Sequence, residues 1–309
     1  MDTLTSIPAS FIKDFSSLHV ADLTTDEHTL LVDYIALTRD IIEANQLFEV
    51  FYFNLLNLQN SFILHYDDEI SRTEHCPDCS SDFIAINAFV INLISSSKTL
   101  TEFSRTTAKR WLGDDNNNYN LYVSKKYDES FNYRFLINLR DYMQHGYLPV
   151  SFFDGRYSFD PDQILDVAHF NVKNKLKNDL ENFIKELEVP DQTNPQIALT
   201  FAISSFVVTV TDIYRKFLYY FQRPVSSSYN EIKELIKEKP SIVCNYHKDF
   251  EGYIIYDIEE DGFHAFNSKD NPNNMINDYA KRCAEIYNDE KAAYDELRTH
   301  FKFVTNAKI

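Results

Sequence analysis

The sequence of 309 residues is poor in the residues that interrupt regular structure, because it has only five glycines and nine prolines. Aromatic residues, in contrast, make up 15% of the chain. Loop-rich and disordered chains show the opposite balance. We therefore expect a globular protein of densely packed helices, long enough for one large domain or two ordinary ones.

The sequence also lacks a long apolar run. Its most apolar segment, ALTFAISSFVVTV at 198–210, contains serine and threonine. This segment is shorter than the ~20 residues that a membrane span needs. The N-terminal segment MDTLTSIPASFIKDF does not combine a basic start with an apolar core, as a signal peptide would. We expect a cytoplasmic protein that does not associate with a membrane.

Several signatures of catalysis or cofactor binding are missing, including a glycine-rich phosphate loop, a G-x-S-x-G elbow and an H-E-x-x-H pair. Two short pairs, Cys76 with Cys79 and Cys244 with His247, could close a tetrahedral zinc site if they met in space. Unrelated reduced thiols are the commoner outcome inside cells. We expect no cofactor.

Basic residues are scarce, and the net charge is −17. Such a charge repels polyanions, so a nucleic-acid partner would need a locally basic surface. The segment 98–140 departs from the trend, because it holds eight basic residues against five acidic ones. This excess could also be a fluctuation over solvated helix faces.

What the sequence does have is helical periodicity, with apolar residues every three to four positions over 30–58 and 83–112. The run DDNNN at 114–118 predicts a solvated loop. We expect the next helix to begin near Asp128 and to end near His145, because Gly146 favours a left-handed C′ position and Pro149 prevents continuation.

The second half of the chain predicts further helices and a small β element. Asp160-Pro161 opens a helix, Arg223-Pro224 marks a break, and alternating residues around Asp261-Gly262 indicate a β-hairpin. The predicted elements are an extended segment at 151–159, helices at 162–188, 196–221, 229–239 and 272–303, and the hairpin at 253–268. We expect a mainly α fold with domains 1–150 and 151–309, which could pack as one.

The segment RDYMQH at 140–145 places an arginine five residues before a histidine at a helix end. With Asp141 after the arginine and the ending QHGYLPV, it resembles the HEPN superfamily. The resemblance covers residues 25–150 in helical character and about a dozen residues in detail. It implies a HEPN-like helical bundle, with the later helices and the hairpin as additions.

Many HEPN proteins are metal-independent endoribonucleases of toxin–antitoxin and antiphage systems. The resemblance therefore implies an RNA substrate, a homodimer with paired motifs, and an antitoxin or defence partner. Histidine can transfer a proton near neutral pH, and arginine presents donors to phosphoryl oxygens. Arg140 and His145 are the predicted catalytic residues, with Asp141 assisting, and Lys125, Lys126 and Arg134 the predicted RNA contacts.

The spacing sets a geometric condition on this hypothesis. Five residues rotate two side chains by about 140° on a helix of ~3.6 residues per turn, so His145 must leave the helical register if it is to meet Arg140. An alternative is that both residues stabilise the helix end through its dipole and its free carbonyls, with Asp141 paired to a neighbouring basic residue. The protein would then be a non-catalytic helical interaction module.

Overall fold

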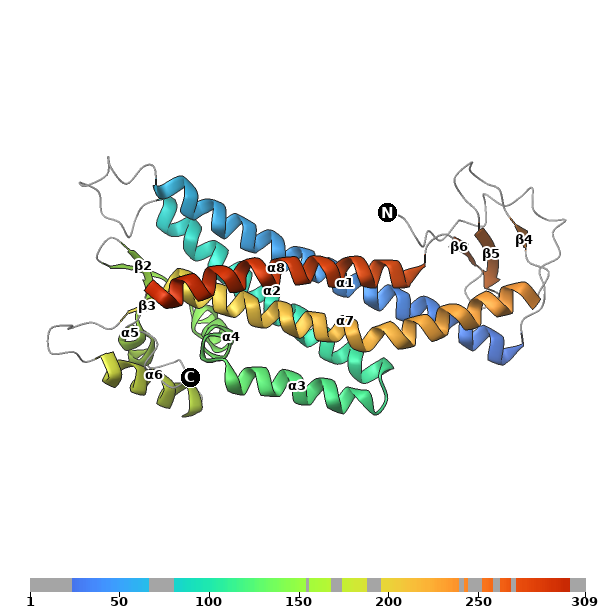
Figure 1. The fold of residues 1–309 in the computed structure, drawn as a ribbon, viewed down its shortest axis with the longest axis horizontal. Helices are drawn as coiled ribbons and strands as arrows, with labels where there is room; N and C mark the ends of the chain where they lie inside the picture. Colours follow the sequence, from blue (N-terminus) through green and yellow to red (C-terminus); the bar gives the residue numbers. More distant parts are fainter. Residues whose placement is uncertain are drawn as a thin grey trace. The chain divides into compact units, whose positions relative to one another are not determined.

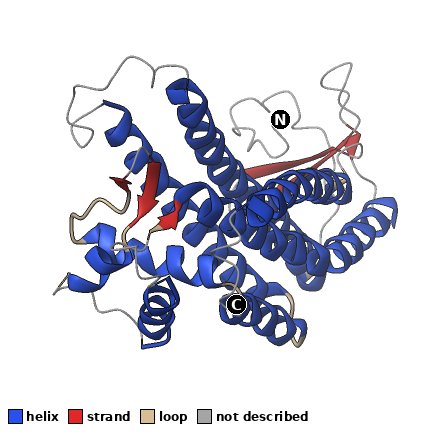
Figure 2. Ribbon diagram, turned by 60° about the vertical axis from the view of Figure 1, so that its left-hand side comes forward, coloured by secondary structure: helices blue, strands red, loops and turns tan. Residues whose placement is uncertain are grey.

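The computed structural model describes residues 24–66, 81–153, 156–167, 174–187, 196–238, 242–243, 252–257, 262–267 and 271–300. Helices dominate these residues and strands are few (Figures 1 and 2), which confirms the predicted mainly α class. The helices are α1 (Thr25–Tyr66), α2 (Ser81–Trp111), α3 (Asp115–Glu129), α4 (Phe131–Gln144), α5 (Pro161–Asp166), α6 (Asn174–Leu187), α7 (Leu199–Glu238) and α8 (Pro272–His300).

The chain forms two compact units. Unit 1 comprises Met1–Ile42 and Leu218–Ala280, and unit 2 comprises Glu43–Phe217 and Lys281–Ile309. These bounds differ from the predicted division at residue 150, which falls inside unit 2. The difference arises because α1, α7 and α8 each contribute one part to each unit.

The core of unit 2 is built largely from aromatic side chains. Phe48 of α1 stacks on Tyr214 of α7 with ring centroids 4.8 Å apart, and Tyr214 stacks in turn on Phe217. The Tyr214 hydroxyl donates to Asn45 Oδ1 at 2.6 Å, so its polar end is satisfied inside the core. Stacked rings of this kind combine large apolar burial with defined geometry, and they hold α1 against α7.

Two of the predicted loops are helical. The polar run 115–118 is exposed or half-buried, as expected, but it forms the first turn of α3. Gly113, with φ 52°, separates α2 from α3, and Tyr119 and Val123 anchor the new helix in the core. The predicted loop was therefore wrong, because these two anchors extend the helix over a segment of low propensity.

The predicted break at Arg223-Pro224 is also wrong, since α7 continues through Pro224. A proline inside a helix costs about 3 kcal/mol. Phe221, Val225 and Tyr229 are all buried around it. The packing of these side chains offsets the lost backbone hydrogen bond.

The predicted helix at 162–188 is instead two helices, α5 and α6.

Unit 2 also contains a three-stranded antiparallel sheet of β1 (Ser151–Phe153), β2 (Arg156–Phe159) and β3 (Ile197–Ala198). Ser151 pairs with Ser158, which pairs on its other side with Ala198. The extended segment expected after α4 is thus a hairpin, and β3 joins it from just before α7. Asp160 follows the sheet and caps α5 by accepting from the Gln163 backbone N–H at 3.0 Å.

In unit 1, the first part of α1 packs against the second part of α7. Its apolar cluster consists of Leu31, Tyr34, Tyr229, Ile232 and Leu235. A second antiparallel sheet has the order β4 (Ile242–Val243), β5 (Gly252–Asp257) and β6 (Gly262–Asn267). β5 and β6 pair from Gly252–Asn267 to Asp257–Gly262, which confirms the predicted hairpin.

Among the described residues, one helical segment, Asp82–Trp111, is long and apolar enough to cross a membrane by length and composition. Its best window has a mean hydropathy of 1.4, and 44% of that window is buried inside the structure. Core helices of soluble proteins meet the same criterion, so this finding does not assign a location. The cytoplasmic location stays a prediction.

Candidate functional site

The helix that carries the Arg–His motif, α4, has well-defined ends. Ser130 is its N-cap, and the Ser130 hydroxyl accepts from the Tyr133 backbone N–H at 3.2 Å. Asp128, where the sequence predicted the helix start, lies in the last turn of α3 instead. The predicted C-terminus is confirmed, because α4 ends at Gln144 and Gly146 adopts φ 88°. Such a positive φ favours glycine.

Aromatic packing holds α4 in place along most of its length. Phe131 stacks on Phe135 and on Phe183 of α6, and Phe135 meets Phe159 of β2 edge to face at 5.3 Å. Tyr142, near the end of the helix, is 1% exposed. The part of α4 before Arg140 is therefore rigidly packed, so the helix presents the motif from a fixed support.

The three motif residues lie at the exposed end of this support. Arg140 is half-buried, and Asp141 and His145 are exposed. His145 is the C-cap, with φ −86° and ψ 7°, so the regular helix ends before it. None of the three side chains makes a hydrogen bond or ion pair with a described residue. Among the described residues, Arg140 and His145 therefore cap no backbone carbonyl, and Asp141 pairs with no basic side chain, as the alternative role would require.

Arg134, predicted to contact RNA, has a different environment, which does not favour such a contact. Its side chain is 5% exposed. Nε and Nη2 donate to Asp179 Oδ2 at 2.8 and 2.5 Å, and Nη1 donates to the backbone carbonyls of Tyr127 and Asp128 at 2.7 and 3.0 Å. Arg134 thus binds α6 and satisfies the last turn of α3, which leaves no open face for a phosphate.

The two predicted lysine contacts also differ from one another. Lys126 Nζ lies 2.7 Å from Asp212 Oδ2, and the same carboxylate accepts from the Tyr122 hydroxyl at 2.5 Å. Lys125 is 68% exposed and makes a 3.6 Å ion pair with Glu129. Lys125 is therefore open to a partner, whereas Lys126 helps to hold α3 on α7.

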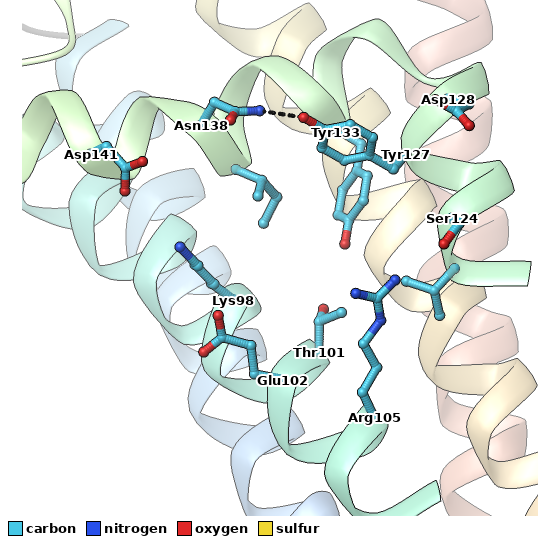
Figure 3. Close-up of a pocket in the computed structure, with 12 residues that line it drawn as sticks. Lys98, Thr101, Glu102, Arg105, Ser124, Tyr127, Asp128, Tyr133, Asn138 and Asp141 are labelled. Atoms are coloured by element: carbon cyan, nitrogen blue, oxygen red, sulfur yellow. Dashed lines mark hydrogen bonds between the residues drawn. The ribbon is translucent and has the colours of Figure 1, made fainter. Parts of the chain in front are cut away.

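A pocket of about 460 Å³ lies between α2, α3 and α4 (Figure 3). α2 contributes Lys98, Thr101, Glu102 and Arg105; α3 contributes Val123, Ser124, Tyr127 and Asp128; α4 contributes Tyr133, Ile137, Asn138 and Asp141. Of the motif, the lining includes Asp141 but neither Arg140 nor His145. The pocket therefore adjoins the motif through one residue.

The polar groups of the pocket are unevenly satisfied. Asn138 Nδ2 donates to the Tyr127 hydroxyl oxygen at 2.9 Å and to the Arg134 carbonyl at 2.7 Å. Arg105 Nε, in contrast, is buried and has no hydrogen-bond partner among the residues that the structure describes. Leaving such a donor unsatisfied costs about 1–3 kcal/mol. Within the described part of the chain, Lys98 and Arg105 form no ion pair.

Burial also changes the acidity of Tyr133. Loss of solvent raises the pKa of the Tyr133 hydroxyl above its ordinary value, and the Thr101 hydroxyl and the Arg105 charge offset part of this rise. The hydroxyl therefore remains protonated at neutral pH and can act as a donor. Figure 3 shows it pointing toward Thr101 and the guanidinium of Arg105.

The sequence interpretation missed this pocket. Lys98 and Arg105 belong to the basic segment, but nothing singled them out from its other cations. Their spacing of seven residues, with Thr101 between them, was an available signal, because residues i and i+7 share one helix face. The hydroxyls of Ser124 and Tyr133 could not be added from sequence, since α3 and α4 bring them to the pocket.

The four residues of the possible zinc site, Cys76, Cys79, Cys244 and His247, lie outside the described residues. Within the described ranges, no group of three or more histidine, cysteine, aspartate or glutamate side chains could hold a metal ion.

Cys283 of α8 is buried, and this burial raises the pKa of its thiol. It is a packed core residue, with its thiol protonated at neutral pH.

Comparisons with family models, with curated proteins and with solved structures find no match to this chain. The resemblance to the HEPN superfamily therefore rests on the motif and on the helical character around it. Activity, partners and RNA specificity have to be argued from the placement of the motif residues.

Proposed function

We propose that the protein is a HEPN-like, metal-independent endoribonuclease of the toxin or antiphage type, with Arg140 and His145 as catalytic residues. The observation that carries the proposal is the state of these side chains. Both stand at the end of a rigid helix without a hydrogen-bond or ion-pair partner among the described residues. Arginine and histidine at such a position can serve an external ligand.

The reaction is an intramolecular transesterification of RNA. The 2′-hydroxyl oxygen attacks the adjacent phosphorus, the bond from phosphorus to the 5′-oxygen breaks, and a 2′,3′-cyclic phosphate and a 5′-hydroxyl result. His145 accepts the proton of the 2′-hydroxyl, and the leaving 5′-oxygen takes up a proton from water or from His145 of the second motif, or His145 protonates the 5′-oxygen while water or the second His145 accepts the 2′-hydroxyl proton. Arg140 donates to the phosphoryl oxygens, where negative charge develops. Asp141, next to Arg140 in sequence, assists by orienting the substrate from the edge of the pocket.

An RNA cleavage assay in EDTA tests the proposal. We expect Arg140→Ala and His145→Ala each to lower the cleavage rate about 10²–10³-fold, because each removes a group that acts in the transition state. Both variants should keep the unfolding free energy within about 0.5 kcal/mol of wild type, since neither side chain makes a hydrogen bond or ion pair with a described residue.

Gln144→Ala is the matched control, because Gln144 is exposed on the same last turn of α4 and has no assigned role. Its cleavage rate should equal that of wild type. If the wild-type protein cleaves neither structured nor unstructured RNA, the nuclease proposal fails. The alternative of a non-catalytic helical interaction module then stands.

The proposed enzyme acts as a homodimer in which two motifs line one cleft. Most of α4 is buried within its own protomer, so the interface has to involve the segment that follows the motif. There, Tyr147 and Leu148 are 37% and 49% exposed, although both are large hydrophobic side chains. Exposed apolar groups beside a functional residue fit a contact between protein chains.

Sedimentation at micromolar concentration measures this assembly. We expect a dimer for wild type and a shift toward monomer for Leu148→Glu, because a charge in an apolar contact is costly to bury. Leu121→Glu is the control, since Leu121 is 68% exposed on α3, away from the motif in sequence. A strictly monomeric wild type would contradict the paired-motif arrangement.

A further inference from the structure

The pocket between α2, α3 and α4 has the size of a small-molecule site. Its volume of about 460 Å³ falls in the range of ~300–1,000 Å³ that ligand pockets occupy. Its lining is mainly polar, and it lies entirely within unit 2. A ligand that enters it must therefore satisfy polar groups as well as fill space.

The donors of the pocket gather near Arg105. Its Nε–H is buried and has no acceptor among the described residues. In Figure 3 the guanidinium extends into the pocket below the Tyr133 hydroxyl, and Ser124 lies on the same side. A guanidinium and two hydroxyls can donate together to an oxyanion, and the planar fork of arginine suits phosphate oxygens well.

The acceptors lie on the opposite side of the pocket. Figure 3 shows the carboxylates of Glu102 and Asp141 there, away from Arg105 and Ser124. The ammonium group of Lys98 lies on the same side as these two carboxylates. Glu102 and Asp141 would repel an anion at this end, but they can accept hydrogen bonds from hydroxyl or amino groups. The third carboxylate, Asp128, is already paired with Lys175 of α6. The two ends therefore favour different parts of one ligand.

We propose that this pocket binds a small phosphomonoester, with the phosphate on Arg105, Tyr133 and Ser124, and the organic part against Asp141 and Asn138. Lys98 supplies a second cation on the same face of α2 and offsets the neighbouring carboxylates. The site goes beyond the proposed nuclease activity, because its phosphate ligands are neither Arg140 nor His145. The phosphomonoester can be a free nucleotide or the 5′-phosphate of an RNA fragment.

Calorimetric titration of the full chain with 5′-AMP tests this site. 5′-AMP has no internucleotide bond, so the result does not depend on RNA cleavage. We expect 5′-AMP to bind, and adenosine, which lacks the phosphate, to bind at least about tenfold more weakly. Arg105→Met should weaken 5′-AMP binding at least about tenfold, and Ser124→Ala about threefold.

The matched control is Lys109→Met. Lys109 is an exposed cation one turn after Arg105 on α2, and it does not line the pocket. Its affinity for 5′-AMP should equal that of wild type. Thermal unfolding with and without 5′-AMP verifies that each variant is folded. If Arg105→Met does not fold, the exposed Ser124→Ala variant still decides the outcome.

Short RNA with and without a 5′-phosphate separates the two ligand sources, in an Arg140→Ala background that prevents cleavage. Tighter binding of the phosphorylated RNA than of 5′-AMP assigns the site to RNA ends, and the reverse assigns it to free nucleotides. The proposal is overturned if wild type binds neither 5′-AMP nor phosphorylated RNA, or if adenosine binds as well as 5′-AMP. It is also overturned if every folded variant among Arg105→Met and Ser124→Ala binds 5′-AMP like wild type.

Discussion

Two arginines on α4 illustrate how position in the fold decides the role of a charge. Arg134 is 4% exposed and bound to Asp179 and to two carbonyls of α3. Arg140, six residues later, is half-buried and makes no hydrogen bond or ion pair with a described residue. The sequence offered helix capping as the alternative role for Arg140, yet the arginine that caps a helix end is Arg134, and the helix is α3.

This comparison teaches that a basic segment is not one functional surface. Within the same stretch, Lys126 is held by Asp212 and Lys125 is largely exposed. Lys98, Arg105, Lys109 and Arg140 make no ion pair with a described residue, so together with Lys125 they are the cations of this segment that remain open to a ligand. For a chain with a net charge of −17, these few groups carry the electrostatic part of any contact with a polyanion.

The largest effect on stability should come from Arg134. We expect Arg134→Met to lower the unfolding free energy by about 2–4 kcal/mol, because it leaves Asp179 and two carbonyls without their donor in a largely buried place. The midpoint of urea unfolding measures the change. Arg140→Met is the matched control, and it should stay within about 0.5 kcal/mol of wild type. Equal unfolding free energies of the two variants would contradict the different roles of Arg134 and Arg140.

A smaller effect should distinguish the two lysines of α3. We expect Lys126→Glu to destabilise the protein by about 1 kcal/mol, since it places a second negative charge beside Asp212, whereas Lys125→Glu should change stability by less than about 0.5 kcal/mol. Chemical unfolding of each single variant measures this difference. Only Lys125→Glu is then a clean test of RNA contact, through weaker binding and a flatter salt dependence. If Lys125→Glu leaves RNA binding unchanged, Lys125 belongs to a solvated surface.

Much of the local structure could be predicted from the sequence. The end of α4 follows from Gly146, the start of α5 from Asp160-Pro161, and the pairing of β5 with β6 from alternating residues around a turn. Each of these signals acts through neighbours in the chain. The predictions failed where packing outweighed them, as at residues 115–118 and at Pro224, which helices of the core incorporate.

The candidate site was only partly accessible to sequence reasoning. The motif identified Arg140, Asp141 and His145, and the structure leaves them without described partners at the exposed end of a rigid helix. Arg105 gave no comparable signal. Its unsatisfied Nε–H depends on what α3 and α4 place around it, and periodicity within α2 does not contain that information.

By itself, the sequence determined the mainly α class, the end of the motif helix and the late hairpin, because glycine, proline and hydrophobic periodicity act within a few residues. Only the tertiary structure decided which cations are structural and which are open. The reason is physical: the partner of Arg134 lies 45 residues away and that of Lys126 lies on α7, so the state of each charge depends on contacts that only folding creates.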